Sequence, residues 1–237
     1  MRRSFLIPVM LMALASTLVA SDSPWSQSLS LGLNLSRGNT ESTQFSGSYA
    51  GKRQYEMSQL SLKANGAFGE ENNTKNTDNY AAEAKFRRTL SGRLFWYVNT
   101  TYESDNIASL DSRITVGPGF GYQFYESETT KYDIEGGLGY DREKYDNIPA
   151  EDGLGYRLAH NFEHHLSSTS KLWHEASVTG PADEGDAYVI KAELGVQSQL
   201  AGNLSLKSVL RDTYSNDPIL GNKKNDITLS TFLVYSF

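Results

Sequence analysis

The chain has no cysteine and only 6 prolines among its 237 residues. Without a thiol, the protein forms neither a disulfide nor a lipoprotein anchor, and thiol catalysis is excluded. After residue 20 there is also no apolar stretch of about 20 residues, which excludes a membrane protein built on spanning helices. What remains is a chain with few breaks in which long strands can form.

The first residues are typical of a secretory signal peptide. Met1–Arg3 is a short basic region, and the apolar run Phe5–Val19 follows it. At roughly 15 apolar residues, this run is short for a retained span of about 20. We therefore expect residues 1–20 to be removed as a signal peptide, with the cleavage position open, and residues 21–237 to form one domain.

The charge balance argues against one class of partner. The formal net charge is −6 at pH 7, and loss of the basic signal residues makes the mature chain more acidic still. An acidic chain is unsuited to binding nucleic acid. The mean hydropathy of −0.48 resembles that of a soluble protein. It does not exclude a barrel, because strands that alternate lipid-facing and lumen-facing residues have a low average hydropathy.

Apolar and polar residues alternate along the mature chain in about twelve segments. In the first, Trp25–Leu35, every second residue from Leu29 onward is leucine, and serine, glycine or asparagine lies between. A period of two is the signature of a strand with one apolar face, and the polar connections alternate between shorter and longer. We predict an all-β fold, an antiparallel up-and-down transmembrane β-barrel of about 12 strands. A soluble all-β sandwich is the competing fold.

Three local features of this pattern carry separate expectations. Around Leu172–Val178 the two faces are ambiguous, because Trp173 competes with Leu172 and His174 for the outward side. Pro118 should mark a bulge or a local break in its strand. The longer connections are expected to be loops such as Gly69–Asn79, and most of them are acidic.

The chain ends on an apolar strand, Ile227–Phe237. Its C-terminal signature is Leu233, Tyr235 and the terminal Phe237 on one face. An open edge with aromatic residues invites aggregation, whereas a closed barrel pairs its last strand with its first. This end predicts a location in the bacterial outer membrane, with outer-membrane lipid as one partner and the barrel-assembly machinery as another, recognised through the C-terminal strand.

Several segments resemble a known family. They are Ser36–Ser42, Asp111–Tyr122, Glu135–Tyr145, and Asp217 onward through Gly221 and Asp226 to Phe237. In these segments the chain resembles the YdiY-like family of salt-induced outer membrane proteins, a family built on a domain of unknown function. The resemblance covers essentially the whole mature chain. It implies an outer-membrane barrel linked to salt or envelope stress, and it assigns no catalytic or ligand residue.

Many charged residues fall on the face predicted to line the lumen. Charges on the lipid face would cost about 2 to 4 kcal/mol each near the midplane, which explains their collection on the other face. Paired across strands, they would make a plugged, rigid network; hydrated, they would line a narrow path for ions or polar solutes. The set is Lys63, Glu83, Lys85, Arg87, Asp133, Glu135, Arg157, Glu163, Lys191, Glu193, Lys207 and Arg211.

Two neighbouring segments place glycines on this same inward face. Gly117, Gly119 and Gly121 alternate in one, and Gly137 and Gly139 in the next. The missing side chains leave either a groove or a packing slot for a large side chain from across the lumen, such as Tyr97 or Phe232. We favour the packing slot.

No motif in the chain carries recognisable chemistry, and no cofactor is implied. The four histidines, His160, His164, His165 and His174, cluster near one predicted turn, and adjacent His164 and His165 point to opposite faces of a strand, which disfavours a shared metal. We expect a non-enzymatic envelope barrel that passes or binds small polar solutes or ions. A plugged structural or surface-interaction barrel, an outer-membrane lipid hydrolase and a soluble periplasmic β-protein are the alternatives.

Overall fold

The computed structural model describes residues 25–36, 42–185, 187–218 and 223–237. The predicted signal peptide, most of the segment Ser36–Ser42, Gly221 and the side chain of Leu35 lie outside these residues. The described part forms twelve strands: β1 (Trp25–Ser36), β2 (Ser42–Gln54), β3 (Ser58–Glu71), β4 (Thr74–Ser91), β5 (Leu94–Asp105), β6 (Leu110–Glu126), β7 (Thr130–Tyr145), β8 (Glu151–His165), β9 (Ser170–Pro181), β10 (Val189–Ala201), β11 (Leu204–Ser215) and β12 (Asn225–Ser236).

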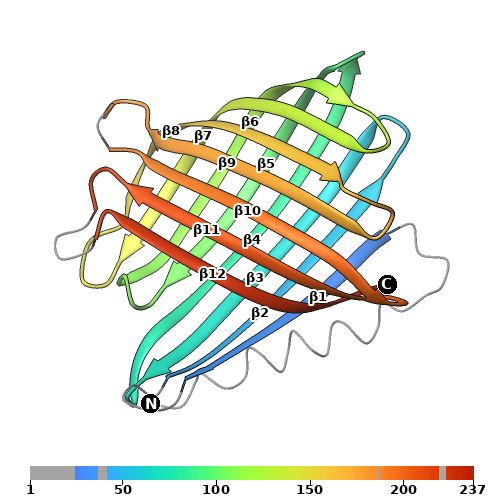
Figure 1. The fold of residues 1–237 in the computed structure, drawn as a ribbon. Helices are drawn as coiled ribbons and strands as arrows, with labels where there is room; N and C mark the ends of the chain where they lie inside the picture. Colours follow the sequence, from blue (N-terminus) through green and yellow to red (C-terminus); the bar gives the residue numbers. More distant parts are fainter. Residues whose placement is uncertain (1–24, 37–41, 186, 219–222) are drawn as a thin grey trace.

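The strands close into a barrel (Figure 1). Each strand pairs antiparallel with the next, and β12 pairs with β1 through pairs such as Leu31 with Leu233. The backbones of Gln27 and Phe237 exchange two hydrogen bonds of 3.1 and 2.9 Å. We call the end where Trp25 and Phe237 lie the terminal end, and the opposite end the distal end. No helix among the described residues is long and apolar enough to cross a bilayer.

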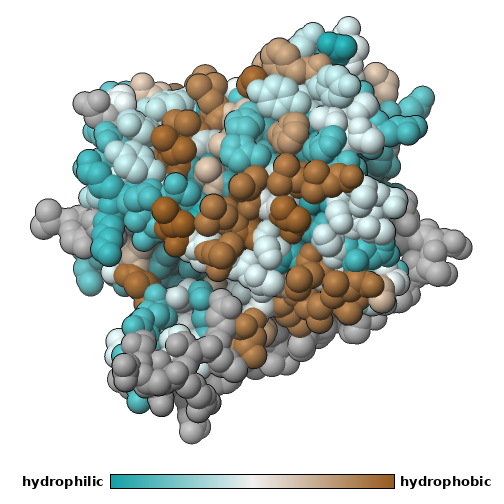
Figure 2. Space-filling view, viewed as in Figure 1, coloured by the Kyte–Doolittle hydropathy of each residue, from teal (hydrophilic) through white to brown (hydrophobic). Residues whose placement is uncertain are grey.

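Side chains alternate between the lumen and the outside, as the period of two predicts. On β5, Phe95 and Tyr97 are 1% exposed inside the barrel, whereas Tyr102 is exposed outside. The ambiguity on β9 is resolved, because Trp173 points inward over Gly195. Leu172 and His174 accordingly face outward. Figure 2 shows hydrophobic side chains gathered across the middle of the visible face, with hydrophilic ones toward its left side, where distal turns lie.

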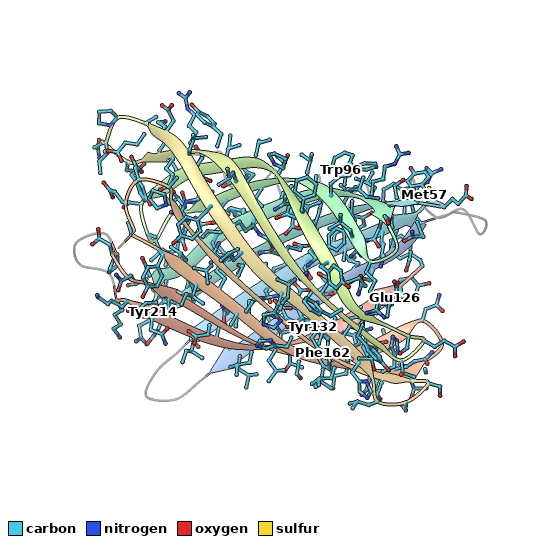
Figure 3. All side chains as sticks on the ribbon, turned by 90° about the horizontal axis from the view of Figure 1, so that it is seen from above. Met57, Trp96, Glu126, Tyr132, Phe162 and Tyr214 are labelled. Carbon is cyan, nitrogen blue, oxygen red and sulfur yellow. The ribbon has the colours of Figure 1, made fainter. Side chains whose placement is uncertain are left out.

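Aromatic side chains lie toward both ends of this apolar band. Trp96, Tyr132 and Phe162 lie toward one end of the barrel and Tyr214 toward the other (Figure 3). Tyr132 and Phe162 are direct cross-strand partners on β7 and β8. Two such girdles suit the two interfaces of a bilayer, where amphipathic rings are favoured.

The distal connections are shorter than the sequence predicted. Between β3 and β4 only Asn72 and Asn73 lie outside the strands, with φ values of 48° and 62°, where an eleven-residue loop, Gly69–Asn79, was expected. Asparagine tolerates the left-handed conformation that such a tight hairpin turn requires. Polar composition does not prevent pairing in water, so the strands continue beyond the apolar band.

Asp78 lies on the outer surface at this distal extension, beyond Tyr80, and is directly opposite Phe68. It accepts hydrogen bonds of 2.7 Å from Lys75 Nζ and 2.9 Å from Asn106 Nδ2. Burial acts to raise the pKa of Asp78, but these hydrogen bonds outweigh it and hold the pKa below its ordinary value of 3.8. Asp78 therefore joins the β3–β4 hairpin to the β5–β6 turn.

The Asp78→Asn variant should lower the free energy of unfolding at neutral pH by about 1 to 2 kcal/mol, because a charge-assisted hydrogen bond is lost. A depressed pKa in the folded state stabilises the protein above the unfolded-state pKa, and the effect is lost as the pH falls through the folded-state value. Urea unfolding in lipid vesicles at several pH values should show wild type and variant converging below pH 3.8. A difference that persists at lower pH would contradict this assignment.

Candidate functional site in the barrel lumen

The most deeply buried charge in the lumen is Glu135 on β7, which is 2% exposed. Lys85 on β4 donates a hydrogen bond to Glu135 Oε1, and Arg157 Nη1 on β8 donates to its Oε2 at 2.8 Å. The Lys85 ammonium also lies 4.8 Å from the ring centroid of Tyr97. Two cations thus compensate one desolvated carboxylate, which is the condition for burying it.

A second group of polar contacts continues this cluster toward the terminal end. Arg87 forms an ion pair with Asp133 at 3.3 Å and donates to Gln123 Oε1 at 2.6 Å. Asn161 donates to the other oxygen of Asp133 at 2.8 Å. The guanidinium of Arg87 lies 3.6 Å from the ring centroid of Phe95, in cation–π geometry. On one wall of the lumen, strands β4, β6, β7 and β8 are therefore joined by a polar network.

Two ion pairs cross the lumen instead of following a wall. Lys63 on β3 reaches Glu175 on β9 at 3.1 Å, and β3 and β9 lie on opposite sides of the ring of strands. Their side chains keep 50% and 41% of their surface accessible, so there is space for water beside this pair inside the barrel. Nearer the distal end, Lys191 on β10 pairs with Glu103 on β5. The lumen is thus bridged by ion pairs at two levels.

The glycine wall, which comprises Gly117, Gly119 and Gly121 of β6 with Gly137 and Gly139 of β7, is filled and not open. A Cβ on Gly137 would lie 2.9 Å from the Tyr97 hydroxyl, and one on Gly121 would overlap the Phe95 ring. The packing slot is therefore confirmed, although Tyr97 comes from neighbouring β5 and not from across the lumen. Phe232, the other expected occupant, instead lies 3.1 Å from a Cβ on Gly32.

Pro118 lies within the glycine wall and interrupts the ladder between β6 and β7. Val116 pairs with Tyr140 and Gly119 pairs with Gly137, but the residues between these two pairs are unpaired in this ladder. The register is the same on both sides of the gap. The predicted local break is confirmed, and the alternative of a bulge is wrong at this position. Proline lacks the N–H for a ladder bond, and the missing side chains of the glycines let the two backbones stay close.

The opposite wall carries an apolar cluster inside the barrel. Val209, Phe232 and Val234 of β11 and β12 are buried together, with Trp173 packed against them. Trp173 Nε1 donates to Glu193 at 2.8 Å, and Arg211 Nε donates to the other oxygen of Glu193 at the same distance. Lys207 donates to Ser30 at 3.0 Å. Of the predicted inward residues of β10 and β11, Glu193 and Arg211 therefore form an ion pair, whereas Lys207 bonds Ser30 of β1.

Most of the predicted lumen charges meet partners, but not always the expected ones. Glu83 is directly opposite Lys63 in the β3–β4 register, yet the Lys63 ammonium bonds Glu175 across the lumen. Glu163 pairs with Lys171 at 3.0 Å near the terminal end.

Several inward charges were missed because they fall in segments expected to be loops or turns. At the distal end, Arg113 binds Glu143 at 2.7 Å and Glu103 at 3.3 Å. Extending the period-two pattern of each strand by two or four residues would have included these three side chains, as well as Lys52 and Lys131.

Charge inside the barrel is segregated along the axis. The middle carries both signs, in the Glu135 and Lys63 pairs already described. The inward residues toward the distal end are mostly acidic, with Glu103, Asp141 and Glu143 beside Arg113 and Lys191. Toward the terminal end they are mostly basic: Lys52, Arg87, Lys131, Lys171 and Lys207. Such a lumen has a different electrostatic preference at each mouth.

The histidines follow the predicted alternation. His164 faces outward and shares a hydrogen bond of 2.8 Å with Thr130, whereas His165 faces Glu163 at 3.7 Å. His160 and His174 contact each other on the outer face, with ring centroids 4.8 Å apart and the planes tilted by 31°. In the part of the chain that the structure describes, no three histidine, aspartate or glutamate side chains group as a metal site would require.

Comparison with known proteins identifies a family for this chain and solved structures with a similar fold. A family model described as "Protein of unknown function, DUF481" matches residues 29–237. No curated protein matches the chain significantly. Many solved structures are similar in fold, and three of them illustrate the likeness. An outer membrane channel from Pseudomonas putida F1 is 12% identical, with a TM-score of 0.54 over 90% of this chain and 95% of that chain.

The two other structures extend the likeness. A KdgM porin, solved in complex with disordered oligogalacturonate, is 10% identical, with a TM-score of 0.52 over 90% of this chain and 99% of that chain. The translocator domain of the autotransporter NalP from Neisseria meningitidis is 15% identical, with a TM-score of 0.51 over 97% and 94%. At such identities the likeness concerns the fold alone. The predicted antiparallel transmembrane barrel of about twelve strands is confirmed.

Proposed function

Since this chain belongs to the DUF481 family and has the barrel fold of outer-membrane proteins, we propose that it lies in the bacterial outer membrane and conducts small ions and polar solutes. In this proposal the terminal end faces the periplasm, as the short turns and chain ends of bacterial barrels do. The barrel has no catalytic role, and its lumen is a narrow water-filled path.

The observation that carries this proposal is the pair Lys63–Glu175. It spans the lumen between opposite walls, and about half of each side chain stays accessible to water. A plugged lumen would exclude water from such a pair. Ion pairs that water reaches contribute little to stability and are screened by salt, so they open at low free-energy cost. Because salt screens this ion pair, a rise in salt concentration would favour opening of the Lys63–Glu175 bridge.

Removing the Lys63–Glu175 bridge should widen the constriction. In planar bilayers the double variant Lys63→Ala/Glu175→Ala should raise the single-channel conductance by about two-fold or more, because a charged bridge in the pore is replaced by water. Wild-type conductance should also rise more steeply with salt concentration than that of bulk solution.

The control is Lys144→Ala, since Lys144 forms an ion pair with Asp111 at the distal end and not at the bridge. A barrel that is folded, as judged by its gel mobility before and after heating, yet conducts no ions in either form would overturn the proposal. It would then favour the competing function, a plugged structural or surface-interaction barrel.

A further inference from the structure

A polar pocket of about 300 Å³ opens at the terminal mouth of the barrel. It lies between the turns that join β8 to β9 and β10 to β11, beside the end of β12. Its ionisable lining residues are Lys171 and His165. The others are Gly202 and residues with hydroxyl or amide side chains: Ser168, Thr169, Ser170, Gln197, Gln199, Asn203, Ser205 and Ser236. A pocket with this lining offers many hydrogen-bond donors beside a positive charge.

Further basic residues lie on the inner face near the same mouth, outside the lining of the pocket itself. Lys171 is directly opposite Gln197, and Gln197 is directly opposite Lys207, so the three form one row across β9, β10 and β11. Lys52 of β2 lies close enough to Lys171 and Lys131 for electrostatic repulsion. With Arg87, these residues form what we call the basic vestibule: Lys52, Arg87, Lys131, Lys171 and Lys207.

The carboxylates beside the basic vestibule are fewer than its five cations. They are Glu126 and Glu163, which are directly opposite Lys131 on the two neighbouring strands, Asp133, and Glu193, which acts on Lys207. Glu163 is shared between Lys171 at 3.0 Å and His165 at 3.7 Å. Asp133 is held by Arg87 and Asn161. Lys207 donates to the Ser30 hydroxyl, and its ammonium lies 4.7 Å from the ring centroid of Phe232. Clustered like charges in a confined space repel one another unless an anion lies among them.

We propose that the basic vestibule and its pocket bind a small multivalent anion, carrying phosphate or carboxylate groups, at the terminal mouth. Lysine ammoniums are point charges that accept varied anion geometries. The hydroxyls and amides of the pocket then hydrogen-bond the remaining oxygens. At the distal end the cations Arg113 and Lys191 are paired with Glu103 and Glu143, so that mouth offers the same anion less positive charge. The site deepens the proposed function by naming a solute class, but its occupancy does not depend on conduction.

Isothermal titration of the folded barrel in detergent tests the site, with inorganic pyrophosphate and citrate as probes in separate arms. We expect saturable binding that weakens at high salt, and at least about ten-fold weaker binding in Lys171→Gln and in Lys52→Gln, since each removes one close charge. Lys144→Gln at the distal end is the matched control and should bind as wild type does. Binding of pyrophosphate alone would identify phosphate as the ligand chemistry, and binding of both probes would show recognition of charge.

Two results would overturn the proposal: no saturable binding of either probe by the folded barrel, or equal affinity in wild type, Lys171→Gln and Lys52→Gln. The second would show that anions bind elsewhere on the surface. Because titration requires no current, loss of the anion site and loss of the proposed conduction are separable. A barrel that binds anions without conducting ions would support the proposed anion site and refute the proposed conduction through the lumen.

Discussion

Replacing Glu135 by alanine is expected to lower the free energy of unfolding by about 3 to 5 kcal/mol, the largest effect of any single charge removal in the lumen. Glu135 is 2% exposed and is the shared partner of Lys85 and Arg157. Without it, two cations remain side by side over Tyr97 with their counter-charge gone. The measurement is equilibrium unfolding in urea with the barrel reconstituted in lipid vesicles.

The matched control is Glu143→Ala, eight residues farther along β7 toward the distal end. Its carboxylate binds Arg113 at 2.7 Å but is about one-third exposed, so its loss should cost about 1 kcal/mol or less. Glu135→Gln keeps the size and one acceptor and should fall between the two. Equal stability of Glu135→Ala and Glu143→Ala would show that burial does not set the strength of the Glu135 cluster.

The Gly117→Ala variant is expected to destabilise the barrel by about 1 to 3 kcal/mol or to prevent its folding, because an added methyl group overpacks a rigid contact. A Cβ at this position would lie 2.7 Å from Gly139 Cα and closer still to the Leu138 carbonyl oxygen. Both atoms belong to the backbone of β7, which cannot move away as a side chain can. Urea unfolding and the yield of heat-modifiable barrel both report the effect.

Gly139→Ala provides a close control, since Gly139 lies in the same glycine wall. There the nearest atom to an added Cβ is Thr115 Cγ2 at 3.3 Å, which a small rotation accommodates. We expect a change in unfolding free energy of less than about 1 kcal/mol. If the two variants are equally stable, the close approach of β6 and β7 around Pro118 is not the reason for glycine at position 117.

The sequence by itself determined the number of strands and the face of nearly every residue in them. Alternation is a local property, since successive side chains of a strand point to opposite sides whatever lies nearby. Leu29, Leu31 and Leu33 could therefore be assigned outward, and Glu135 and Arg157 inward, without knowledge of any neighbour. The same reasoning was insufficient at Trp173, because large aromatic side chains occur on both faces of a barrel strand.

Only the tertiary structure decided which inward charges meet. Closure of the barrel places β3 opposite β9 and β5 opposite β10, so Lys63 finds Glu175 and Lys191 finds Glu103. Partners this far apart in the chain depend on strand tilt and register around the whole ring, which no local pattern encodes. The lengths of the distal turns were also decided there, since polar residues pair their backbones in water as readily as they form loops.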